Sequence, residues 1–148
     1  MQITSTYFQD GEPIPERFSR KGEDINPAVT FSEISPEAKS LALVIEDPDA
    51  PNGIFTHWIL YNMSPGTLQI TDGELPVSGQ QGRNDYGDTK YGGPQPPSGT
   101  HRYFFKLFAL DTMLSTDSEF KRPEFDEAID GHVIDEVSIM GIYSANDA

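Results

Sequence analysis

The feature that most constrains the fold of this chain is a stretch of 23 residues, 79–101, built almost wholly from turn-forming residues. It holds six glycines and three prolines and runs directly into an aromatic segment, residues 103–110 (YFFKLFAL). A loop of this length in a compact domain is usually functional or disordered. Because its prolines stiffen the backbone and Tyr86 and Tyr91 offer anchors, we expect an ordered loop. It would deliver His101 to the start of a buried strand, and we expect a ligand to bind there.

Length and composition favour one globular domain, residues 1–148, with a sizeable core. Hydrophobic residues make up 36% of the chain, with 9 Phe and 6 Tyr, which argues against disorder. The absence of cysteine excludes disulfides, thiolate metal sites and thiol catalysis. The N-terminal residues lack the pattern of a signal peptide, and no apolar run is long enough to span a bilayer. We therefore expect a cytoplasmic protein with no membrane span.

The net charge of −14 is unevenly distributed along the chain. Residues 111–148 carry ten acidic residues against only Lys121 and Arg122. Such a surface repels nucleic acid and anionic lipid, so we expect no nucleic-acid partner. The simpler interpretation of the charge is solubility, and the alternative is an acidic docking face for a basic partner.

The hydrophobic pattern predicts a mostly-β chain. Aromatic and β-branched runs predict strands over residues 41–46, 56–62 and 103–110, and further strand-like pieces lie at 2–8 and 29–31. A short helix is predicted over 124–130, ended by Gly131, while 134–140 is compatible with either a helix or a strand. Because the strands do not alternate with long helices, a parallel α/β sheet is not expected.

Side chains alternate along a strand, and each of the predicted strands 41–46, 56–62 and 103–110 has a polar residue at one end of an apolar face. Asp47 continues the face of Leu41, Leu43 and Ile45; His57 shares a face with Ile59 and Tyr61; His101 precedes Tyr103, Phe105 and Leu107. If these faces meet in one core, Asp47, His57, His101 and Tyr103 meet at its rim. A carboxylate beside two imidazoles would hold them oriented or charged, and the tyrosine hydroxyl would add a donor. This set suits a small anion, phosphate above all.

Other interpretations of the same residues remain open. His57 could be an ordinary strand-end histidine, Asp47 and Asp49 could be turn formers, and Tyr103 could be plain core. A metal site could use His57, His101 and Asp47 as two imidazoles and a carboxylate. A hydrolase could use Ser98 as nucleophile and His101 as base, although no G-x-S-x-G motif is present.

Three segments together resemble a known family. They are residues 47–51 (DPDAP), the pair His57-Trp58, and residues 91–103 (YGGPQPPSGTHRY), with a further likeness at 82–87 (GRNDYG). The chain resembles the phosphatidylethanolamine-binding protein (PEBP) family, and most of all its bacterial and archaeal branch, the Raf kinase inhibitor-like proteins. The likeness extends over nearly the whole chain.

The resemblance implies a PEBP-like fold in which a large antiparallel sheet packs on a smaller sheet, with short C-terminal helices. It also implies an anion-binding cavity without enzymatic activity, cofactor or metal. The residues it assigns to the cavity are Asp47, Asp49, Pro51, His57, Gly93, Pro94, His101 and Tyr103. We expect backbone amides near 93–95 to complete the cradle. Gln95 departs from the family pattern and would narrow the mouth or add a donor.

The resemblance further implies which partners the protein has. The small-molecule ligand would be phosphate or the phosphorylethanolamine-like head group of a phospholipid. The protein partner would be a kinase or protease that the protein inhibits, or a component of a signalling pathway that it modulates. A second copy of the chain would form a homodimer with the first.

Overall fold

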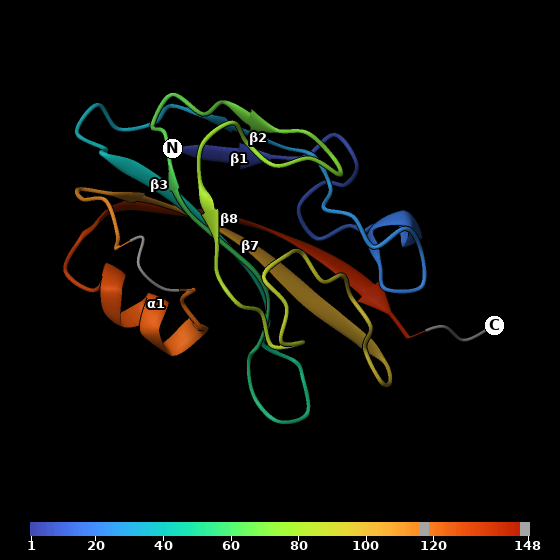
Figure 1. Cartoon of the computed structure of the whole chain (residues 1–148). Coiled ribbons are helices and arrows are strands. Elements are labelled where there is room, and N and C mark those ends of the chain that lie inside the picture. The colour runs from blue at the N-terminus through green and yellow to red at the C-terminus, as the bar shows by residue number, and fades with distance from the viewer. Residues whose placement is uncertain (116–118, 146–148) are drawn as a thin grey trace.

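The structure, a computed structural model, describes residues 1–115 and 119–145 and contains two antiparallel sheets (Figure 1). The smaller sheet has the order β1-β2-β5, with β1 (Gln2–Thr4), β2 (Val29–Ser32) and β5 (Gln69–Ile70). The larger sheet has the order β6-β4-β3-β7-β8, with β6 (Gln80–Gln81), β4 (Phe55–Met63), β3 (Ser40–Asp47), β7 (Thr100–Leu110) and β8 (Val133–Ser144). The predicted mostly-β fold, with a large sheet on a smaller one, is confirmed.

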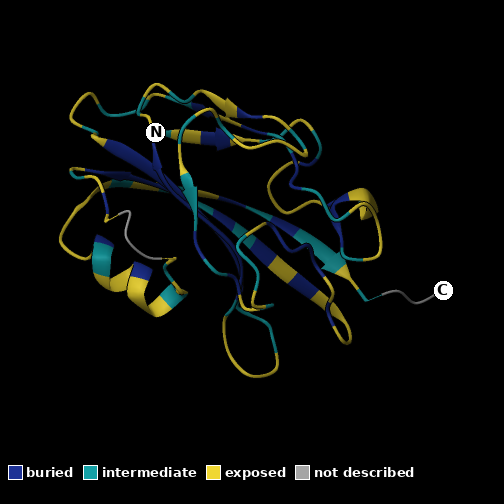
Figure 2. Cartoon of the chain, viewed as in Figure 1, coloured by how far each residue is buried: buried dark blue, intermediate teal, exposed yellow. Residues whose placement is uncertain are grey.

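The central strands of the larger sheet are covered on both faces (Figure 2). One face packs on the smaller sheet in a core that includes Leu43, Phe31 and Phe105. The other face packs on the helix α1 (Arg122–Ile129) through Val44 and Phe125, among others. Every residue of β3 is buried, which explains why its sequence is a continuous apolar run rather than an alternating one.

Helical structure is sparser than expected. Within the described residues the only α-helix is α1, which begins two residues before the predicted start and ends before Gly131, whose φ is +79°. A 3-10 turn, η1 (Glu16–Phe18), lies near the N-terminus. Residues 134–140 belong to β8, because they pair in register with β7 along nearly its whole length. No helix in the described part of the chain is both long and apolar enough to cross a bilayer.

A β-bulge in β4 decides where His57 points. Ile45 of β3 pairs with Trp58 and Glu46 pairs with Thr56, so His57 is an extra residue between two register positions. Trp58 faces the smaller sheet and His57 lies on that same side, beside the ring of Tyr103. The predicted shared face of His57 with Ile59 and Tyr61 is therefore wrong, since those two side chains pack toward α1.

Candidate functional site

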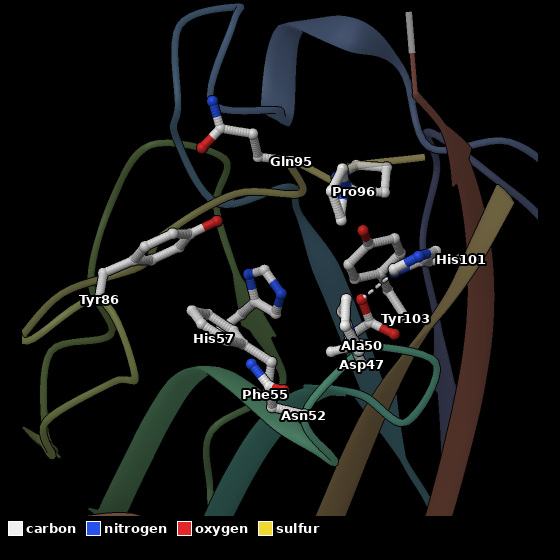
Figure 3. A pocket seen from close by; sticks show the side chains of 12 residues that line it. Asp47, Ala50, Asn52, Phe55, His57, Tyr86, Gln95, Pro96, His101 and Tyr103 are labelled. Atoms are coloured by element: carbon white, nitrogen blue, oxygen red, sulfur yellow. Dashed lines mark hydrogen bonds and ion pairs between the residues drawn. The ribbon is translucent and has the colours of Figure 1, made fainter. Parts of the chain in front are cut away.

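The candidate site is a cavity of about 250 Å³ at one end of the larger sheet (Figure 3). Because β3 runs antiparallel to both β4 and β7, its C-terminal end lies between the N-terminal ends of its two neighbours. Asp47, His57 and His101 come from these three ends. The cavity is lined by Asp47, Ala50, Pro51, Asn52, Phe55, His57, Tyr86, Gln95, Pro96, Pro97, His101 and Tyr103.

Asp47 holds His101 in place. His101 donates from Nδ1 to the Asp47 carboxylate at 2.5 Å, and both side chains are buried. The other carboxylate oxygen accepts the backbone N–H of Asp49 at 2.7 Å. With Nδ1 engaged in this way, Nε2 is the ring nitrogen of His101 that is left for a ligand.

His57 is held by a carbonyl instead of a carboxylate. Its Nδ1 donates to the Gly92 carbonyl at 2.7 Å, and the Gly92 N–H returns a bond to the His57 carbonyl at 3.1 Å. Three rings surround the imidazole: Phe55 at 4.8 Å, Tyr103 at 5.2 Å and Tyr86 at 5.6 Å between ring centroids. Burial lowers the pKa of His57, against the weaker opposing effects of the Gly92 carbonyl and the nearby carboxylates. Of the two imidazoles expected beside Asp47, only His101 is hydrogen-bonded to it, while His57 senses its charge without a bond.

Tyr103 brings an unpaired hydroxyl to the cavity. The residue is 1% exposed, and its oxygen has no hydrogen-bond partner among the described residues. In Figure 3 the hydroxyl lies on the side of Pro96, within the ring of lining side chains. Burial, reinforced by the Asp47 carboxylate, raises its pKa, so the group is a neutral O–H that can donate.

The long loop is ordered by side-chain hydrogen bonds, as its two tyrosines predict. Tyr86 donates from its hydroxyl to the Gly93 carbonyl at 2.9 Å, and the buried Tyr91 donates to the Phe18 carbonyl at 2.7 Å. Buried Asn84 accepts the N–H groups of Tyr86 and Asp88 on its side-chain oxygen. The same side chain donates to the Lys90 carbonyl at 2.7 Å. The loop thereby forms a fixed wall of the cavity.

Of the loop positions 93–95 that were expected to complete the cradle, neither Gly93 nor Pro94 has a free N–H. The Gly93 N–H donates to the Asp24 carboxylate at 2.7 Å and the Gly92 N–H to the His57 carbonyl, while Pro94 has no N–H to offer. Gly93 instead permits close packing, because a Cβ there would lie 2.2 Å from the Phe18 carbonyl oxygen.

Five of the eight residues assigned to the cavity line it: Asp47, Pro51, His57, His101 and Tyr103. Gly93 and Pro94 lie behind the wall, where their carbonyls accept bonds from Tyr86 and from the Arg20 N–H. Asp49 turns away to Arg102, whose side chain donates two bonds of 2.9 Å and whose backbone N–H donates a third. These bonds lower the pKa of Asp49 to about 2, so its charge is balanced outside the cavity.

Sequence reasoning missed several residues of the wall. Asn52 and Ala50 stand in the turn after β3, and Phe55 precedes the bulge. Pro96 and Pro97 belong to the glycine-proline segment 79–101, which was predicted to border the site, but neither proline was predicted individually. Gln95, singled out as a departure from the family pattern, does line the cavity and is exposed. Asp24 had no signal, because its contact with the loop spans 69 residues of sequence.

The geometry also bears on the two alternative chemistries. In the described ranges, 1–115 and 119–145, no three His, Cys, Asp or Glu side chains are arranged to hold a metal ion, so Asp47, His57 and His101 do not form such a set. Ser98 is exposed in a bend and does not line the cavity that contains His101.

Comparison with known proteins agrees with the fold and the site sequence. The sequence model of the family described as phosphatidylethanolamine-binding protein matches residues 4–144. A protein named UPF0098 from Methanothermobacter thermautotrophicus is 41% identical over 148 residues, covering 97% of this chain and 98% of that protein. One of the same name from Chlamydia trachomatis serovar D has the same identity and coverage.

Two solved structures are similar over their full length. The crystal structure of the PEBP homologue CT736 from Chlamydia trachomatis matches with a TM-score of 0.93 and 40% identity, covering 98% of this chain and 97% of that one. Escherichia coli YbcL, described as a member of the mammalian PEBP family, matches with a TM-score of 0.92 and 28% identity, covering 98% of each chain. The chain thus belongs to the phosphatidylethanolamine-binding protein family.

Proposed function

We propose that the cavity binds a small phosphate-like anion, and that the protein is a binding protein rather than an enzyme. The observation that carries this proposal is the unpaired, buried hydroxyl of Tyr103 among the lining residues. A buried donor without a partner is costly, and a ligand oxygen would relieve that cost. The Nε2 atoms of His57 and His101 would supply further contacts to a ligand in the same cavity.

The charge of the site favours an anion over a cation. The Asp47 carboxylate already accepts hydrogen bonds from His101 and from the Asp49 N–H, one on each oxygen. As an imidazolium, His101 donates to Asp47 from Nδ1 and to a ligand from Nε2.

The walls limit the size of the ligand. The cavity wall is apolar around the polar groups of Asp47, His57 and His101. The apolar lining residues are Ala50, Pro51, Phe55, Pro96 and Pro97. A volume of about 250 Å³ lies below the ~300–1,000 Å³ of sites for drug-sized ligands. The cavity therefore suits a phosphate group with a short substituent, of which a phospholipid head group is one source and free phosphate another.

Calorimetry at pH 6 tests the proposal with inorganic phosphate, phosphorylethanolamine and ethanolamine. We expect the first two to bind and ethanolamine, which lacks the phosphate group, not to bind. His101→Gln removes a charge-assisted donor and should weaken phosphate binding at least tenfold, roughly the value of such a bond. His132→Gln is the matched control, because His132 is exposed and pairs with Asp111. Equal binding by all three proteins, or none by the wild type, would overturn the proposal.

Inhibition of a kinase or protease and homodimer formation remain predictions from the family resemblance, and a cytoplasmic location remains a prediction from the sequence. Sedimentation of the purified protein tests the dimer. Inhibition assays against kinases and serine proteases of the native organism, with and without competing phosphate, test whether the cavity mediates such a role.

A further inference from the structure

A buried ion cluster lies on the face of the larger sheet opposite the cavity. Its centre is Glu46, which is 4% exposed and precedes Asp47 in β3. One Glu46 oxygen lies 2.7 Å from Nη2 of Arg122, the first residue of α1, and the other lies 3.1 Å from Nζ of Lys106 in β7. The proposed anion site uses none of these groups.

Arg122 also reaches the neighbouring strand. Its Nη1 donates to the hydroxyl of Thr56 at 3.4 Å, and its Nε lies 2.7 Å from the Asp126 carboxylate. Thr56 precedes His57 and pairs directly with Glu46 across the two strands. A single guanidinium therefore contacts the residue before Asp47 and the residue before His57, at the first register position beyond the bulge.

A bulge leaves its extra residue without a ladder partner, so the orientation of that residue depends on how the strands are fixed on either side. Toward the sheet centre, Ile45 and Trp58 are buried in the main core. At the outer side, the Glu46–Thr56 pair is fastened by Arg122, and Thr56 also exchanges two bonds with Asp85, at 2.7 and 2.9 Å. The guanidinium joins the two strands through an ion pair with Glu46, whose Oε1 lies outside hydrogen-bond geometry, and through a hydrogen bond to Thr56.

We propose that Arg122 is a positioning residue of the cavity: by clamping Glu46 and Thr56 behind the sheet, it holds the bulge that turns His57 toward Asp47 and His101. This role rests on the proposed anion site, but it can be tested without a ligand. Lys106 is a natural control, because it pairs with the same Glu46 carboxylate from β7 and belongs to the strand on the other side of β3 from β4.

The experiment compares the full-length variants Arg122→Gln, Thr56→Val and Lys106→Gln by NMR of the imidazole rings. The chain has only three histidines, so the signals are readily assigned. We expect Arg122→Gln and Thr56→Val to shift the ring signals and the titration midpoint of His57, while Lys106→Gln leaves both at the wild-type values. Thr56→Val keeps the Arg122–Glu46 ion pair, so it provides the test if Arg122→Gln does not fold.

Phosphate titration forms the second arm. The two clamp variants should bind inorganic phosphate about tenfold more weakly, as expected when a contact group is misplaced, with Lys106→Gln within about twofold of wild type. If the wild type binds no phosphate, the proposed function fails. The His57 signals of the variants still test whether Arg122 positions His57. The positioning role would be overturned if Thr56→Val had the His57 signals of the wild type, or if Arg122→Gln and Lys106→Gln shifted them equally. The ion cluster would then contribute only to the stability of the fold.

Discussion

Asp47 and His101, 54 residues apart in sequence, are joined by a hydrogen bond of 2.5 Å at the floor of the cavity. The bond connects the C-terminal end of β3 to the N-terminal end of β7 and leaves Nε2 as the free ring nitrogen of His101. It thus contributes to both the stability of the sheet end and the chemistry of the site. The two contributions can be separated by substitution.

Asp47→Asn should destabilise the protein by about 1–3 kcal/mol, because it weakens a buried charge-assisted bond. Denaturant unfolding at pH 7 measures the change. Asp111→Asn is the matched control, since Asp111 pairs with His132 at 2.8 Å but both side chains are 46% exposed. The control should change stability by less than about 0.5 kcal/mol. Equal changes in the free energy of unfolding for the two substitutions would show that the buried pair stabilises the protein no more than the exposed pair does.

Tyr103→Phe should separate stability from binding. The hydroxyl makes no hydrogen bond to the described residues, so its removal should leave the free energy of unfolding unchanged or raise it by up to about 1 kcal/mol. Phosphate affinity should fall about fivefold or more because the ligand loses a donor. Thermal unfolding and calorimetry on one preparation measure both. A destabilised variant with unchanged affinity would place the hydroxyl in a structural role instead.

The empty protein should lose stability as the pH falls below about 6.5. Burial lowers the pKa of His57 from its ordinary value of 6.5, so the unfolded chain binds this proton more readily than the folded one. The stability contributed by the neutral ring is present above pH 6.5 and is lost as the pH falls toward the lowered value. His57→Gln should show a shallower decline between pH 7 and 5 in denaturant unfolding.

Phosphate should counteract this decline in the wild type, since the anion favours the protonated site. A decline equally steep in His57→Gln would contradict the assignment of this pH dependence to His57.

Gly93→Ala should destabilise the loop wall, because its Cβ would lie 2.2 Å from the Phe18 carbonyl oxygen and 2.9 Å from the Ser19 carbonyl carbon. We expect a loss of about 1–3 kcal/mol, typical of overpacking, together with weaker phosphate binding. Gly66→Ala is the control, as the nearest atom to its Cβ would be the Ser64 hydroxyl at 3.6 Å. Melting temperatures that fall equally in both variants would argue against the close approach.

Much of the fold follows from local sequence pattern. The buried runs of β3, β4 and β7 are rich in aromatic and β-branched residues, which favour pleated, apolar surroundings. These three strands could therefore be predicted from the local pattern alone. Residues 134–140 were ambiguous because an edge strand with one solvated face carries a weaker pattern. Their pairing with β7 is a long-range property and could not be predicted from the segment alone.

The site residues that lie in regular strand positions near the strand ends could be predicted from the sequence. Asp47, His101 and Tyr103 follow the regular alternation of β3 and β7, and the structure brings them together. His57 reaches the cavity for a different reason than strand phase predicts, because a bulge inserts it between two paired positions. Asp24, which takes the Gly93 N–H, comes from a segment whose approach to the loop only the folded chain reveals.

The central claim, that a phosphate-like anion binds among His57, His101 and Tyr103, is tested most directly by a ¹H–¹⁵N NMR titration with inorganic phosphate at pH 6. The account predicts saturable shifts in the amides of residues 47–57 and 101–103, absent in His57→Gln and His101→Gln and retained in His132→Gln. Shifts that do not saturate, that fall elsewhere on the surface, or that persist unchanged in both cavity variants would contradict it.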